Sequence, residues 1–203
     1  MAYCVIRIYK GAANVDTVLE HVRTGLIPRI ARIPGFNRYA AFKVSDGRLG
    51  SFSVFDDKAA AEQSTSVARD FIKGVPELAK LAADESMQGE IGLSIIGSAP
   101  AAGTGHAVMR LYRTAASFAD VNAAIEQEAM ARLRDIPGLR RYSTAKLEDG
   151  RIATIAGFES EQAAKASTAL AKELRQQGQS KLAKLLPGDP QVIEATVLHV
   201  HLK

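Results

Sequence analysis

Two pairs of an arginine and a tyrosine are the residues in this chain best suited to chemistry. Arg7 and Tyr9 lie two positions apart, and Arg110 and Tyr112 repeat the pair 103 positions later. A guanidinium stays charged and anchors anions, whereas a phenol donates a hydrogen bond or a proton. His106 precedes the second pair, and its imidazole titrates near neutral pH. The predicted catalytic set is therefore His106, Arg110 and Tyr112.

The two arginines have two interpretations, and the residues leave both open. An arginine on a covered sheet face needs a carboxylate or an anionic ligand, because an unpaired buried charge costs several kcal/mol. Glu90 and Glu194 match each other in the repeat and begin the last strand of each copy. Arg7 and Arg110 are thus either members of structural ion pairs or anchors for a ligand.

Further polar residues continue the same strand face into a hairpin, and together they form the predicted ligand-binding set. Its members are Arg7, Tyr9, Tyr39, Lys43, Tyr142 and Lys146. No metal site is expected, because the single cysteine, Cys4, has no cysteine partner and the pair His199 and His201 lacks a third ligand. No cofactor is predicted either.

An internal repeat determines the predicted domain organisation. Residues 33–39 return as 136–142, and Asp46-Gly47-Arg48 returns as Asp149-Gly150-Arg151 at the same offset. One offset held over several separated matches indicates a duplicated unit. The predicted domains are a first repeat at 1–97, a Gly- and Pro-containing linker at 98–105, and a second repeat at 106–203.

Each copy changes its hydrophobic period in the order β-α-β-β-α-β, which is typical of a ferredoxin-like unit. In the first copy the predicted elements are a strand at 3–9, a helix at 14–33, strands at 38–44 and 48–55, a helix at 57–73 resumed to about 83, and a strand at 89–96. The predicted fold is α+β: two ferredoxin-like units forming one intramolecular α+β barrel with antiparallel sheets.

The first strand alternates two kinds of side chain. Cys4, Ile6 and Ile8 are purely apolar and are predicted to lie under the helices, whereas Arg7 and Tyr9 belong to a mixed set predicted to face a partly polar lumen between the sheets. The lumen is therefore the expected ligand site.

The composition of the chain limits the classes of molecule that it is expected to bind. The formal net charge is +4, but basic and acidic residues are interspersed, so no nucleic acid is expected. No apolar run approaches the roughly 20 residues that cross a bilayer, and Arg7 interrupts the N-terminal apolar segment, so a soluble cytoplasmic protein of bacterial type without membrane contact is predicted. The expected partner is a small, anionic or aromatic ligand.

The stretch Ile33-Pro34-Gly35-Phe36, followed by a hairpin and residues 54–60, resembles the antibiotic-biosynthesis-monooxygenase group of dimeric α+β barrel proteins. Family members usually form the barrel as homodimers; a tandem chain would form it alone, with a homo-oligomer of tandem barrels still open. The resemblance implies oxidation of polycyclic aromatic compounds without a cofactor.

A related branch of that family degrades haem with an Asn, a Trp and a His. Those positions fall near Tyr3 and His106, on Phe55 and Phe158, and near Ser66 and Ala169, so none of the three is retained. The chain contains no Trp at all. Haem degradation of this type is therefore not expected.

The sequence thus favours a small-molecule-binding barrel, with a cofactor-independent monooxygenase or a related enzyme acting on an aromatic or quinone-like compound as its activity. The alternative is a non-catalytic barrel that serves stress response or protein interaction. A remote alternative is an RNA-binding module, because residues 48–55 faintly resemble the aromatic strand of RNA-recognition domains.

Overall fold

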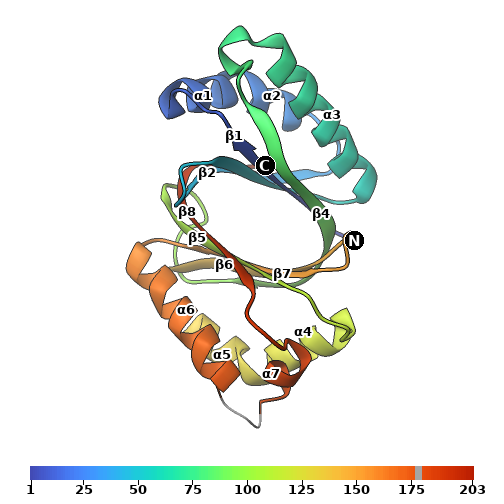
Figure 1. Ribbon diagram of the computed structural model, residues 1–203, viewed down its shortest axis with the longest axis vertical. Helices are drawn as coiled ribbons and strands as arrows, with labels where there is room; N and C mark the ends of the chain where they lie inside the picture. The colour runs from blue at the N-terminus through green and yellow to red at the C-terminus, as the bar shows by residue number, and fades with distance from the viewer. Residues whose placement is uncertain (177–179) are drawn as a thin grey trace. The chain divides into compact units, whose positions relative to one another are not determined.

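The computed structural model describes residues 1–176 and 180–203, and its strands and helices follow one another in two series (Figure 1). The first series is β1 (Tyr3–Lys10), α1 (Val15–His21), the π-turn η1 (Val22–Leu26), α2 (Ile27–Ile30), β2 (Phe36–Val44), β3 (Leu49–Phe55), α3 (Lys58–Gly74), the 3-10 turn η2 (Pro76–Leu78) and β4 (Ala82–Ile96). The second is β5 (Gly105–Tyr112), α4 (Phe118–Glu128), α5 (Met130–Arg134), β6 (Leu139–Leu147), β7 (Ile152–Phe158), α6 (Glu161–Gln176), α7 (Lys181–Leu185) and β8 (Gln191–Leu202).

Antiparallel pairing orders the strands β1-β3-β2-β8-β5-β7-β6-β4 in a closed barrel, so the predicted α+β class and antiparallel barrel are confirmed. The chain divides into two compact units. The first comprises residues 1–90, 102–104 and 195–203, and the second comprises 91–101 and 105–194. The C-terminal part of β4 thus belongs to the second unit and the C-terminal part of β8 to the first, a grouping that differs from the repeats at 1–97 and 106–203.

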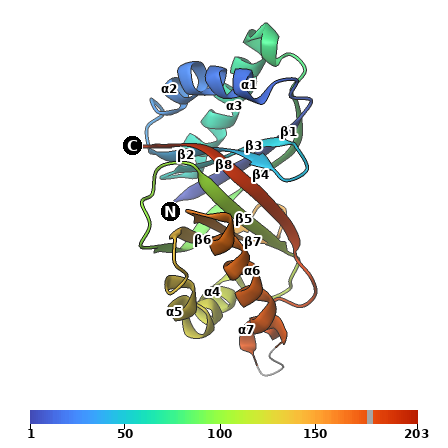
Figure 2. The ribbon, with the colours of Figure 1, turned by 90° about the vertical axis from the view of Figure 1, so that its left-hand side faces the viewer.

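In the first unit, β1 lies between β3 and the start of β4, which places Arg7 opposite Ser51 on one side and Ser86 on the other. Helices α1, α2 and α3 cover one face of this sheet (Figure 2). Asn14 begins α1 as predicted, because its side chain accepts hydrogen bonds from the backbone of Asp16 and Thr17. Helix α1 therefore begins at a capped residue, and it covers a sheet whose strand β1 contains Arg7.

The second unit repeats this plan with β5 next to β7 and β7 next to β6. Helices α4 to α7 pack on one face of these strands around Val121, Ile125, Leu170 and Leu174. Ser117 caps α4 by accepting from the backbone N–H of Asp120 at 3.1 Å. Arg110 of β5 lies opposite Thr154 of β7, the position that Ser51 holds in the first unit.

Two predicted features of the first copy were wrong. Residues 82 and 83, predicted as the end of a resumed helix, belong to strand β4, which pairs with β1 between Lys10 and Arg7 and so begins before the predicted start at 89. The face assignment of β1 is reversed as well: Val5 packs with the helices in the core, Tyr3 lies against it, and the apolar residues Cys4, Ile6 and Ile8 point to the opposite face. Arg7 and Tyr9 therefore lie on the helix-covered side and not in a lumen.

Among the described helices, none combines the length and the hydropathy needed to span a bilayer.

One packing difference between the units yields a test of the core. Gly50 of β3 faces Phe42 of β2, whereas the matching positions in the second unit are Ala153 and Ala145. A Cβ on Gly50 would overlap the Phe42 ring and come within 2.9 Å of the carbonyl oxygen of Arg7. The large ring and the missing side chain are thus complementary.

We expect Gly50→Ala to destabilise the protein by about 2 kcal/mol in urea unfolding, because it overpacks this contact. Phe42→Ala removes the clash, so the same Gly50→Ala change made in that background should cost less by about 1 kcal/mol or more. Strict additivity of the two substitutions would contradict this account of the packing.

Candidate functional site

Arg7 is the centre of a polar cluster beneath α3. Its side chain is only 3% exposed, and its Nη2 donates hydrogen bonds to Ser64 Oγ at 2.7 Å and to Thr65 Oγ1 at 2.9 Å. Ser64 Oγ in turn donates to the carbonyl of Ala61 at 2.7 Å. Because that bond uses the hydroxyl's proton, a lone pair remains to accept from the guanidinium. The groups of α3 that accept hydrogen bonds from Arg7 are therefore uncharged hydroxyls.

These acceptors do not neutralise the charge. Within the described part of the chain, Arg7 Nε and Nη1 are buried and have no hydrogen-bond partner. Burial lowers the pKa of the Arg7 guanidinium, and the nearby phenols of Tyr9 and Tyr39 act in the opposite direction. The first unit thus holds a positive charge in its interior with two nitrogens still able to donate.

Two phenols accompany this charge. Burial raises the pKa of Tyr9, and it raises the pKa of Tyr39 to about 12, with a hydrogen bond to Ser51 acting against the rise. Both phenols are consequently protonated at neutral pH and can donate a hydrogen bond to a ligand oxygen.

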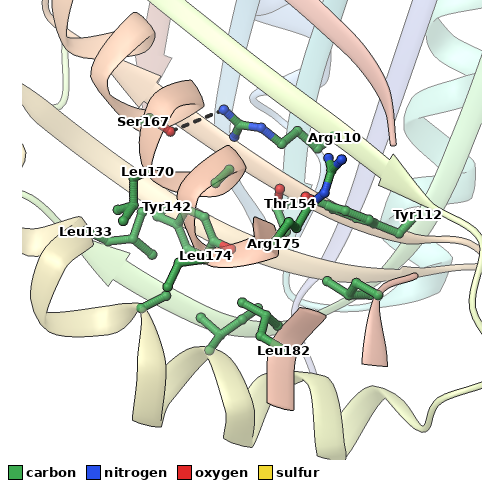
Figure 3. Close-up of a pocket in the computed structure, with 14 residues that line it drawn as sticks. Arg110, Tyr112, Leu133, Tyr142, Thr154, Ser167, Leu170, Leu174, Arg175 and Leu182 are labelled. Carbon is green, nitrogen blue, oxygen red and sulfur yellow. Dashed lines mark hydrogen bonds between the residues drawn. The ribbon is translucent and has the colours of Figure 1, made fainter. Parts of the chain in front are cut away.

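The second unit contains the same cluster (Figure 3). Arg110 is 4% exposed and extends from β5 toward α6, where its Nη2 donates to Ser167 Oγ at 3.4 Å and to Thr168 Oγ1 at 2.9 Å. Burial lowers its pKa, and the phenols of Tyr112 and Tyr142 oppose this shift. Burial raises the pKa of both phenols.

Cavities adjoin both clusters. In the second unit a cavity of about 50 Å³ has a polar lining of Arg110, Tyr112, Tyr142, Thr154, Ser167 and Arg175, and apolar residues of the covering helices complete it. In the first unit a cavity of about 40 Å³ includes Tyr9 and Tyr39, and another of about 250 Å³ includes Arg7 and Tyr9. Each of these cavities therefore lies between a sheet and its own helices, and its size and lining can be compared with those of ligand sites.

The structure brings together six of the predicted site residues, three in each unit, and separates the other three from them. The six are Arg7, Tyr9, Tyr39, Arg110, Tyr112 and Tyr142. Lys43 and Lys146 are exposed. His106 is half-buried and does not line the described cavity around Arg110, which lies four positions further along the strand, a distance of about 13 Å.

The predicted arginine–glutamate pairs are absent from the described residues. Arg7 bonds hydroxyls, and Glu90 lies opposite Tyr3 in the ladder. Glu194 is exposed and raises the pKa of Arg110 only through space. The hydroxyl partners were missed, although their repeat was a usable signal: Ser64-Thr65 matches Ser167-Thr168 at the offset that relates the arginines.

The histidines of β8 and the aromatic residues of β3 bear on two further predictions, the absence of a metal site and the RNA-binding alternative. No group of three metal-ligating side chains occurs among the described residues, and His201 lies against the Phe36 ring at 5.9 Å between centroids. Phe52 and Phe55, the aromatic residues behind the RNA-binding alternative, are 8% and 0% exposed. Rings buried in this way are not available for stacking on bases.

Comparison with known proteins identifies the fold. No protein-family model and no curated protein sequence matches the chain. Among solved structures, a candidate monooxygenase from Fusobacterium nucleatum has a TM-score of 0.70 at 11% identity, covering 100% of this chain and 94% of that one. An anthrone oxidase-like protein has a TM-score of 0.62 at 13% identity, covering 99% and 93%.

A ferredoxin-fold protein from Listeria monocytogenes, related to antibiotic-biosynthesis monooxygenases, has a TM-score of 0.54 at 13% identity, covering 98% of this chain and 95% of that one. Chlorite dismutases share the fold too. The predicted resemblance to antibiotic-biosynthesis-monooxygenase-type α+β barrel proteins is therefore confirmed at the level of the fold, which different reactions share.

From the uncompensated charge of Arg7 we predict how its substitution changes the free energy of unfolding. Arg7→Met keeps the length of the side chain and removes a buried cation, so we expect the free energy of unfolding to rise, on the order of 1 kcal/mol. Arg110→Met should raise it less, because Glu194 favours the charge of Arg110 through space. A loss of about 3 kcal/mol in Arg7→Met would instead reveal a buried ion pair.

The buried phenols predict a loss of stability in alkali. Between pH 10 and pH 12 the unfolded chain releases the proton of Tyr39, whose pKa is ordinarily 10.0, while the folded chain keeps it up to about 12. The unfolded state then binds fewer protons, so stability is intact below pH 10 and falls as the pH rises. Tyr39→Phe should reduce the slope by roughly 1.4 kcal/mol per pH unit; equal slopes in both proteins would refute it.

Proposed function

We propose that this chain, which has the fold of the monooxygenase-like α+β barrel proteins, binds a small aromatic or quinone-like compound in the pockets between its sheets and helices and oxidises it without a cofactor. The observation that carries the proposal is the repeated cluster of a buried guanidinium and two protonated phenols beside a cavity. We propose also that the duplicated sequence corresponds to two ferredoxin-like units in tandem, which together supply the strands of the barrel.

The cluster suits a ligand that becomes an oxyanion. A guanidinium in a low-dielectric pocket favours the charged form of a neighbouring phenol or enol and so lowers its pKa. Arg7 and Arg110 would hold the developing charge, and the phenols of Tyr9 and Tyr112 would donate hydrogen bonds to the same oxygen. The deprotonated ligand is richer in electrons and thus a better reductant.

Oxidation of such a ligand balances without any electron carrier. A methylene group of an aromatic ketone reacts with one molecule of dioxygen to give a new carbonyl group and one molecule of water. Both C–H bonds of the methylene break, the carbon loses four electrons, and dioxygen accepts them, leaving one oxygen atom in the new carbonyl and the other in water. The protein's part is to bind the ligand, stabilise its anion and exclude bulk water.

One observation favours the non-catalytic alternative. Every phenol in the two clusters has a raised pKa, so none of them accepts a proton at neutral pH, and His106 lies outside the lining of the described pocket. Under this alternative the barrel binds its ligand, or a partner protein, without chemical change. Binding and turnover must therefore be measured separately.

Nitrophenol is a suitable probe, because its colour reports its ionisation. We expect bound nitrophenol to have a pKa at least one unit lower than in solution, and Arg7→Met/Arg110→Met to abolish the shift. Lys43→Met/Lys146→Met, which removes two exposed cations from the predicted set, is the matched control and should leave it intact. An unshifted pKa in the wild type, or equal effects of the two double variants, would exclude the proposed site.

Anthrone then distinguishes the two functions. Consumption of one molecule of dioxygen for each carbonyl formed, lost in Arg7→Met/Arg110→Met, supports the oxidase. Binding of anthrone without uptake of dioxygen supports the non-catalytic alternative.

A further inference from the structure

The two clusters differ in what surrounds them. The cavity of about 250 Å³ beside Arg7 is lined from α3 and the start of β4 by charged as well as apolar groups. Thr65, Arg69 and Lys73 line it from positions four residues apart on α3, so they follow one another along a single helix face. A hydroxyl and two cations thus extend in a row from the buried guanidinium to the exposed end of the helix.

The net charge of this lining is positive. Arg7, Arg69 and Lys73 contribute three positive charges and Glu85 one negative charge, which leaves +2. The Glu85 carboxylate accepts a hydrogen bond from Arg48 Nη1 at 3.0 Å and so already has a cationic partner. Arg69 lies 3.7 Å from the exposed Asp70, a contact that water and salt screen. An anion in this cavity would meet an excess of cations.

Apolar side chains complete the lining of this cavity. Ile72 and Leu81 line it, and both also line a neighbouring cavity of about 40 Å³ whose other residues are mostly apolar, including Leu19, Phe71 and Leu78. The larger cavity therefore has a cationic side formed by Arg7, Arg69 and Lys73 and an apolar side formed by Ile72 and Leu81.

The second unit distributes its cations differently. At the positions that match Arg69, Ile72 and Lys73 it has Lys172, Arg175 and Gln176. Arg175 lines the cavity of about 50 Å³ together with Arg110, and it also forms an ion pair with the exposed Asp189. The cation at the outer end of the row is thus replaced by an amide, and the cavity is smaller than the one beside Arg7.

Resting on the proposed function, we infer that the ligand of the first unit is a small aromatic carboxylate. Its carboxylate accepts from the unpartnered nitrogens of Arg7, near Arg69 and Lys73, and its ring lies in the same cavity of about 250 Å³, against Ile72 and Leu81. A monoanion matches the single charge buried at the inner end, whereas a phosphate dianion would leave an excess negative charge there.

The test uses the full chain and two probes of equal shape, naphthalene-2-carboxylate and its neutral amide, in isothermal titration calorimetry. We expect the carboxylate to bind at least tenfold more tightly than the amide, with the difference shrinking as salt is added. Arg7→Lys should remove most of that preference, because an ammonium group on a shorter, differently shaped side chain cannot reproduce the guanidinium contacts.

Exposed positions provide the matched comparison. Arg69→Gln/Lys73→Gln should weaken carboxylate binding threefold or more and leave amide binding unchanged. Lys172→Gln/Lys184→Gln, which removes two exposed cations from the second unit, should change neither. Far-UV circular dichroism checks that all variants fold. Equal affinity for the two probes, or equal effects of the two double variants, would overturn the inference.

The two proposals fail in different ways. If nitrophenol binds with a shifted pKa but naphthalene-2-carboxylate shows no preference over its amide, the carboxylate inference is wrong and the proposed function stands. If none of the three compounds binds, the proposed function is wrong as well.

Discussion

A buried guanidinium without a carboxylate partner is the constraint around which each unit is built. Arg7 and Arg110 occupy equivalent places on the central strands, and in both units a Ser-Thr pair on the covering helix accepts their hydrogen bonds. Burying such a charge lowers stability, because hydroxyl groups replace only part of the hydration that the charge loses. That such a group occurs at equivalent places in both units supports the proposal that a ligand supplies the missing acceptor.

The remaining polar groups of each unit follow from that charge. Two tyrosines lie close enough to oppose the fall in the arginine pKa, and their own pKa values are raised by burial. The result is a pocket with one permanent cation and several donors but few acceptors. Such a pocket selects a ligand by its charge and its oxygen atoms, while apolar helix residues provide contact area without specificity.

The two units contain different pockets. Phe42 and Gly50 in the first unit correspond to Ala145 and Ala153 in the second, so the same pair of strands is packed by a ring in one case and by two methyl groups in the other. Ile72 corresponds to Arg175, which pairs with Asp189. The two units thus share the hydrogen bonds of the arginine and differ in the size and lining of the adjoining cavities.

The sequence by itself determined the repeat, the order of strands and helices, the α+β class and the types of residue that form the clusters, because these depend on local periodicity and on matches at a fixed offset. The tertiary structure decided which face of each strand the helices cover. Alternation along Tyr3 to Tyr9 defines two faces but does not say which is covered, and the rule that the more apolar face lies inward fails when both faces are buried. Only the folded chain places Ser64 and Thr65 above Arg7, since contacts between residues nearly sixty positions apart depend on how the helix packs and not on any local pattern.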